Sequence, residues 1–317
     1  MSKIILKHSG GNGVSLNPPT SAPGSSEVAF KLPSTDGTAN QLLKTDASGN
    51  LGWRDLPTFA VGGEVKEYVE SGTTYRAHTF LGTSKFITTG ALTVDYLLVA
   101  GGGGSTAAEG NSGSGGGAGG GGMVVATSQA IAEGTHTVTV GAGAAKSTNY
   151  SVTASAGGNS TFNSHVATGG APGPKYGVVG PDGGCGAGGS ESSKAGGSTN
   201  QNTYSGVTNV TGYGNDGGDA AGYPSGGSGA GGGAGGAGGN ANGGTVAGGI
   251  GRASTFRDGS SVTYARGGNG VEGNTNSSDE AANTGNGAHG VSVDGATSNT
   301  NSGDGGSGIV VIRYAVS

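Results

Sequence analysis

The segment at residues 226–239 reads GGSGAGGGAGGAGG, with glycine at every third position from Gly226 to Gly238. Two earlier segments keep the same spacing, one through Gly101, Gly104, Gly110, Gly113, Gly116, Gly119 and Gly122, with Ala107 in the one missing position, the other through Gly180, Gly183, Gly186 and Gly189. Three residues per turn is the period of a polyproline II helix and not that of a strand or an α-helix. We therefore expect the glycine-rich tracts to form polyproline II helices.

Such helices can be held together only by contacts with one another. A polyproline II helix makes no internal hydrogen bonds, so its N–H and C=O groups are free to bond a neighbour wherever glycine lets two backbones approach. Nine prolines are too few for collagen. A flexible Gly/Ser linker is the alternative, but the spacing persists across interruptions by Asn, Ala and Tyr. We expect valine at Gly232 to disrupt the packing and a loop glycine in 273–290 to tolerate it.

Composition and charge exclude several classes of protein. Of 317 residues, 76 are glycine, and 15 basic against 20 acidic residues leave a net charge of −5. Because no basic run occurs, we expect no nucleic-acid partner. The single Cys185 cannot form an internal disulfide, and between glycines it reads as a small apolar filler more readily than as a reactive thiol. No stretch is apolar enough to span a membrane, and residues 1–8 lack the core of a signal peptide, so we expect synthesis in a cytoplasm.

Apolar runs bracket the glycine-rich region. Residues 92–100 are the most apolar window and lead straight into four glycines, while residues 308–314 form a matching run after the last tract. We expect these two strands to pair and to close the region at its base. Further strands are expected at 75–80, 84–88, 138–140, 161–162 and 261–265.

The N-terminal residues alternate short β-like runs with turn signals. We expect strands at 3–7 and 28–32, a loop at 15–26, and a hairpin that joins 41–45 to 51–56. These runs are too poor in apolar residues for a monomeric core, so we expect them to associate with other copies. The predicted fold is all-β plus polyproline II. We expect residues 1–60 to serve attachment and oligomerisation and residues 61–100 to form a β connector. Residues 101–317 are expected to form a sandwich of packed polyproline II helices that is closed by β-strands and carries tip loops.

Three sequence segments, occurring in the same order along the chain, resemble the glycine-rich domain of bacteriophage tail-fibre proteins and adhesins. They are VDYLLVAGGGG at 94–104, THTVTVGAG at 135–143 and GGSGIVVIRY at 305–314, and the resemblance runs from about Tyr75 to Tyr314. Residues 29–53 look like a segment found in phage fibre and structural proteins. The resemblance implies a virion protein whose tip loops bind a host surface receptor, either a polysaccharide or an outer-membrane protein. It also implies contact with other tail proteins and, by analogy, a homotrimer.

Two other kinds of protein share this composition. One is a purely structural fibre or decoration protein without receptor binding. Because the sequence contains no long repetitive shaft, both a whole fibre and a tip carried by another protein stay open. The other is an ice-binding or extracellular-matrix glycine protein, against which the phage-like segment and the missing signal peptide argue.

The sequence offers little support for an enzyme or a cofactor. The phosphate-loop pattern fails at Gly143–Ser147, where Ala145 precedes the lysine, and the five histidines occur singly. We therefore expect no catalysis, no cofactor and no metal centre. Asp216 and Asp219 could bind Ca²⁺, but turn formation is the simpler interpretation.

Tyrosines in the interruptions are the candidate receptor-binding residues. Tyrosine offers amphipathic contact area at low entropic cost, which suits recognition of sugars or protein loops. Packing against the end of the glycine core is the alternative role. The best candidates are Tyr204, Tyr213 and Tyr223, followed by Tyr150 and Tyr176, and the polar runs 190–203 and 272–284 are candidate tip loops.

Overall fold

The fold is described from a computed structural model, which covers residues 4–7, 13–16, 24, 31–38, 41–46, 48, 50–55, 58–108, 113–222, 226–293 and 301–316. The chain divides into two compact units, Met1–Pro57 and Thr58–Ser317. The described residues contain strands and irregular segments but no helix, so this part of the chain is all-β. Accordingly, none of it forms an apolar helix that could cross a membrane.

The first unit contains two antiparallel hairpins. Strand β1 (Ile4–Lys7) pairs with β2 (Gly13–Leu16), so residues 15 and 16 continue a strand where we expected a loop. Strand β3 (Gln41–Thr45) pairs with β4 (Leu51–Asp55), which confirms the predicted hairpin. The strand expected at 28–32 lies mostly outside the described residues.

A carboxylate organises the loop of the β3–β4 hairpin. Asp46 Oδ1 accepts the N–H groups of Ser48 and Asn50 at 2.8 and 3.1 Å, and Oδ2 accepts the side-chain amide of Asn50 at 2.6 Å. These hydrogen bonds, that of the Asn50 side chain first, hold the pKa of Asp46 below its ordinary value. The loop therefore has a defined turn.

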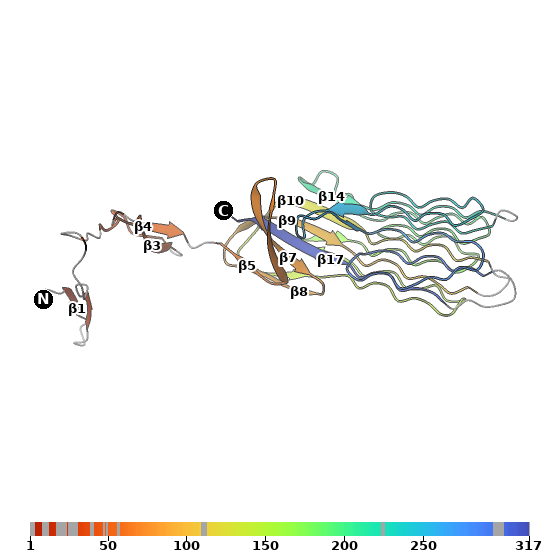
Figure 1. The fold of residues 1–317 in the computed structure, drawn as a ribbon, viewed down its shortest axis with the longest axis horizontal. Coiled ribbons are helices and arrows are strands. Elements are labelled where there is room, and N and C mark those ends of the chain that lie inside the picture. The colour runs from red at the N-terminus through yellow and green to blue at the C-terminus, as the bar shows by residue number, and fades with distance from the viewer. Residues whose placement is uncertain are drawn as a thin grey trace. The chain divides into compact units, whose positions relative to one another are not determined.

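A six-stranded antiparallel sheet dominates the strands of the second unit (Figure 1). Its order is β14-β10-β9-β17-β7-β6. The predicted pairing of the two apolar strands is confirmed, since Val99 of β9 lies opposite Ile309 of β17. The strands are β6 (Glu64–Glu70), β7 (Thr73–Phe80), β9 (Leu92–Val99), β10 (Met123–Ile131), β14 (Val210–Tyr213) and β17 (Ile309–Ala315).

Smaller sheets cover both faces of this sheet, which explains why β9 and β17 carry apolar residues on both of their faces. Tyr96 and Ile312 point into one core with Phe86 and Phe162, whereas Leu97 and Val311 point into a second core that includes Tyr264. The covering elements are a three-stranded sheet, β5 (Ala60–Val61), β8 (Ser84–Thr88) and β11 (Gly134–Val138), and the hairpins β12 (Ser160–Phe162) with β13 (His165–Ala167) and β15 (Arg252–Ser254) with β16 (Val262–Tyr264).

A buried arginine connects three strands of the six-stranded sheet. The side chain of Arg313 is 8% exposed; its Nη1 lies 2.5 Å from Glu70 on β6, and its Nε lies 3.1 Å from Asp95 on β9. The guanidinium also stacks on the rings of Tyr75 and Phe256, with its central carbon 4.1 and 3.9 Å from their centroids. Two carboxylates and two aromatic faces therefore compensate the burial of this charge.

From the strands, glycine-rich runs extend to the opposite end of the unit, where they turn back (Figure 1). These runs bond to one another through their backbones. Three consecutive glycines donate to three different runs: Gly101 N–H to Gly158 O at 3.0 Å, Gly102 N–H to Gly306 O at 2.9 Å and Gly103 N–H to Gly119 O at 3.0 Å. Each of these inner glycines is therefore bonded in a different lateral direction.

The surroundings of the glycine α-carbons repeat every three residues. A Cβ atom on Gly101 would overlap the carbonyl oxygen of Ala142, and a Cβ on Gly104, three residues later, would overlap that of Ala145. The two glycines between them face other runs: Gly102 faces Asn286, and Gly103 faces Ala171. We expected one glycine in three to face a neighbour, but an inner run has neighbours in all three directions. This is why several glycines occur in succession.

Asparagine and aspartate side chains bond to backbone N–H groups between adjacent runs. Asn269 Oδ1 accepts the N–H of Gly248 at 2.9 Å, and Asn286 Oδ1 accepts that of Arg266 at 3.1 Å. Asp216 and Asp219 do the same for Thr199 and Gly196, at 2.7 and 2.9 Å. We had expected these two carboxylates to form turns within their own segment. Instead, they bridge adjacent runs.

The contacts of the glycines predict a matched pair of variants. In Gly232→Val the new side chain would overlap the carbonyl oxygens of Asn215 and Asp216, whereas around Gly244 there is open space. We expect Gly232→Val to separate the runs, at a cost of roughly 1–3 kcal/mol for each buried polar group left unpaired, and Gly244→Val to be mild. Limited proteolysis and thermal unfolding measure the difference; equal resistance would mean that the spacing of three has no structural role. Glycines 285, 287 and 290 are unsuitable controls, because they too contact backbone.

A buried histidine predicts a pH dependence of stability. His78 is fully buried, Nδ1–H donates to Gly62 O at 2.7 Å, and Nε2 has no hydrogen-bond partner. Burial lowers the pKa of His78 below its ordinary value of 6.5. The unfolded chain therefore binds this proton first as the pH falls, so stability present above pH 6.5 is lost below it. Urea unfolding between pH 8 and 5 should show a steeper loss for the wild type than for His78→Phe; parallel curves would exclude His78 as the cause.

Candidate functional site

Several loops lie at the end of the second unit opposite the strands (Figure 1). We call residues 147–152, 175–178 and 191–194 the distal loops. Lys175 Nζ donates to Ser151 O at 2.9 Å, and Ser192 Oγ donates to the hydroxyl of Tyr176 at 3.0 Å. The three loops therefore hold one another in place.

Tyr150 and Tyr176 line a single hollow among these loops. The hollow has a volume of about 210 Å³, and each of the two tyrosines is 45% exposed. Small buried side chains add to its wall. The remaining lining residues are Ala107, Ala108, Gly115, Ser151 and Lys175. The hollow thus combines aromatic and aliphatic surface with a cation and hydroxyl groups.

Residues 113 and 114 fix the position of Tyr176 and of the third loop. Gly113 has a φ of +71°, which favours glycine, and a Cβ there would displace the Glu191 carboxylate and would meet the Tyr176 ring at 2.8 Å. The N–H of Ser114 donates to Glu191 Oε2 at 3.0 Å, and the N–H of Glu191 donates to Ser114 O at 3.1 Å. The tyrosine ring therefore rests on backbone that is itself bonded.

Two of the three tyrosines ranked first from the sequence, Tyr204 and Tyr213, lie away from this hollow. Tyr204 packs against the core at the strands, where its hydroxyl accepts the N–H of Val166 at 2.6 Å. Tyr213 is the last residue of β14, and the guanidinium of Arg252 lies 3.7 Å from its ring centroid. Tyr204 therefore belongs to the apolar core at the strands and not to the distal loops. Tyr223 lies outside the described residues.

The two polar runs expected as tip loops are distal only in part. Residues 191–194 and 272–275 turn at the distal end, but the rest of each run returns toward the strands. For example, Gly197 N–H donates to Ala187 O at 2.8 Å within the packed runs. Lys175 and Ser151 also line the hollow, and neither was predicted from the sequence. The sequence around Lys175 does carry a loop signal, since Pro172, Pro174 and Gly177 surround it.

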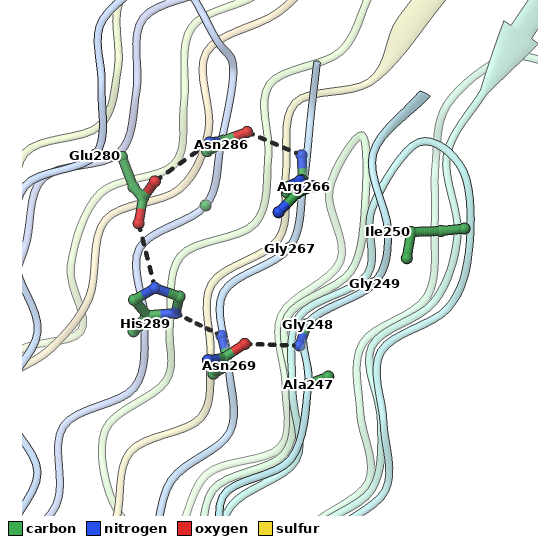
Figure 2. A pocket seen from close by; sticks show the side chains of 11 residues that line it. Ala247, Gly248, Gly249, Ile250, Arg266, Gly267, Asn269, Glu280, Asn286 and His289 are labelled. Atoms are coloured by element: carbon green, nitrogen blue, oxygen red, sulfur yellow. Dashed lines mark hydrogen bonds and ion pairs between the residues drawn. The ribbon is translucent and has the colours of Figure 1, made fainter. Parts of the chain in front are cut away.

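A second hollow, of about 380 Å³, lies on the side of the packed runs (Figure 2). Most of its polar groups bind one another. Glu280 accepts the side-chain amide of Asn286 at 3.3 Å and lies 3.6 Å from His289 Nε2, while His289 Nδ1 accepts the N–H of Asn269 at 2.8 Å. These groups connect neighbouring runs, so their arrangement is explained without a ligand.

In the described part of the chain, the cysteine and the two aspartates considered as candidate reactive or metal-binding residues have structural roles. Cys185 is fully buried, and burial raises its pKa to about 12, so it is protonated at neutral pH. Among the described residues, no group of three or more His, Cys, Asp or Glu side chains is placed to hold a metal ion. The carboxylates of Asp216 and Asp219 accept backbone N–H groups, as described above.

One comparison with known proteins finds a family. A family model described as a glycine-rich domain matches residues 78–315, from strand β7 to the end of β17. The chain therefore belongs to the glycine-rich domain family. No curated protein matches it.

Proposed function

We propose that this chain is a bacteriophage tail-fibre or tail-tip adhesin that binds the host cell surface without catalysis. The observation that carries the proposal is the hollow between Tyr150 and Tyr176, which exposes aromatic surface on loops joined by the hydrogen bonds of Lys175 and Ser192. A rigid scaffold that ends in interacting loops is a common arrangement for recognition. The resemblance of residues 75–314 to phage tail-fibre and adhesin domains supports the virion location.

We further propose that the glycine runs are polyproline II helices packed as a sandwich. The threefold repeat of their surroundings supports this, because in a helix with three residues per turn each third residue faces the same neighbour. The lateral N–H bonds of Gly101, Gly102 and Gly103 to three different runs support it as well. A rigid sandwich would keep the distal loops in place while force acts on the fibre.

In this proposal the N-terminal residues join copies of the chain into a trimer and attach it to other tail proteins. The first unit leaves apolar side chains uncovered within the described residues: Leu32 is 77% exposed, Leu42 52%, Leu43 48% and Trp53 40%. The two leucines are adjacent on β3, so they point to opposite faces of the hairpin. Association of several hairpins would cover both faces.

Blocking of adsorption tests the adhesin proposal against a purely structural fibre. Saturating full-length chain should prevent phage from adsorbing to host cells, because it occupies the receptor. The exposed residues Ser151 in a distal loop and Ser84 on β8 offer a matched pair of variants. We expect Ser151→Arg to weaken blocking at least severalfold and Ser84→Arg to leave it unchanged. Full adsorption in the presence of the wild-type chain would favour the structural fibre.

Sedimentation tests the trimer. We expect the full chain to sediment at three times the monomer mass at micromolar concentration, because the exposed leucines of β3 are buried on association. The double variant Leu42→Asp, Leu43→Asp should sediment as a monomer. A wild-type chain that remains monomeric across this range is incompatible with the proposal.

A further inference from the structure

We infer that the hollow between Tyr150 and Tyr176 binds one pyranose ring of a bacterial surface polysaccharide. This inference rests on the proposed function and deepens it, since it selects a glycan and not an outer-membrane protein as the receptor. It depends on the size of the hollow, on its apolar surface and on the hydrogen-bond donors at its rim.

The size of the hollow favours a small ring. At about 210 Å³ it lies below the ~300–1,000 Å³ of pockets for drug-sized ligands. A stable contact with a folded protein buries about 800 Å² on each partner. A concave site this small can enclose one sugar unit, while the rest of a polysaccharide continues along the loop surface.

The aromatic and aliphatic surface suits the C–H face of a sugar. A pyranose ring presents C–H groups on its faces and hydroxyls around its edge. Tyr150 and Tyr176 each keep nearly half of their surface exposed, whereas Ala107 and Ala108 are only 4% and 6% exposed, so the two rings supply most of the apolar surface that a ligand can reach. Tyrosine rings provide broad contact at low entropic cost because only two torsions are ordered. One pyranose can therefore pack against tyrosine while its hydroxyls reach the rim.

The hydrogen-bond donors at the rim are already oriented. Lys175 Nζ donates one hydrogen to Ser151 O at 2.9 Å, which leaves two for a ligand. The hydroxyl of Tyr176 accepts from Ser192 Oγ at 3.0 Å, so its own hydrogen is available to donate. Sugar hydroxyls accept such bonds, and donors held in place lower the entropic cost of binding.

Direct binding to glycans tests the inference without a known host. The full-length chain and its variants are applied to immobilised bacterial lipopolysaccharide O-chains and capsular polysaccharides. We expect saturable binding to at least one, with affinity reduced about tenfold by Tyr150→Ala or Tyr176→Ala, as for truncated aromatic anchors. Tyr176→Phe should cause a smaller loss, because it keeps the ring and removes the donor. Val179→Ala is the control: Val179 is 56% exposed and does not line the hollow.

Treated host cells distinguish failure of this inference from failure of the adhesin proposal. Periodate cleaves sugar diols, so it should abolish binding of the chain to cells, whereas protease treatment should preserve it. Binding that survives periodate but not protease would overturn the glycan inference and leave the adhesin proposal standing. Equal binding by Tyr150→Ala, Tyr176→Ala and the control would also overturn the inference. Glycan binding without any block of adsorption would retain the inference and reject the adhesin role.

Discussion

The second unit depends on one constraint: backbone can hydrogen-bond to backbone in several lateral directions only where no side chain intervenes. The net contribution of one hydrogen bond to the free energy of folding is about 0.5–1.5 kcal/mol, whereas ordering the backbone of one residue costs about 1–2 kcal/mol of conformational entropy. A single glycine run therefore cannot order itself. The runs become stable together, when inner residues such as Gly101, Gly102 and Gly103 find partners in different neighbours. The apolar sheet supplies the burial that the runs lack, because β9, β10 and β17 lead directly into or out of them.

The elements at both ends of the glycine-rich region could be predicted, because β9 and β17 are apolar on both faces and adjoin glycine. Strand β10 was not predicted, although it lies between β9 and β14. Its apolar residues are followed by Thr127, Ser128 and Gln129, and the pairing with β9 shifts between Ala126 and Gln129, where Ser128 has a φ of +53°. This irregularity interrupts the alternation by which a strand is recognised.

The position of the tyrosines could not be predicted for a different reason. Runs extend from the strands and turn back at the opposite end, so a turn between two runs lies at one end of the unit or at the other (Figure 1). The turn at 191–193 is distal, while residues near Tyr204 adjoin strands β13 and β14. Local sequence also conceals the side-chain bridges, because Asn269 and Gly248 are 21 residues apart. Only the three-dimensional order of the runs brings Tyr150 and Tyr176 to one hollow.

The amide and carboxylate side chains that bridge adjacent runs also limit how far the stack of runs can extend sideways. A backbone N–H left open at the side of the stack would be a template on which another extended chain could add, as at an open sheet edge. Asn269, Asn286, Asp216 and Asp219 occupy such donors with short side chains. A stack of runs that bond through their backbones could in principle be extended by further chains, as a fibril is. The polar side chains on its outer N–H groups oppose such addition. A few Asn and Asp residues thereby help to keep a glycine-rich lattice finite.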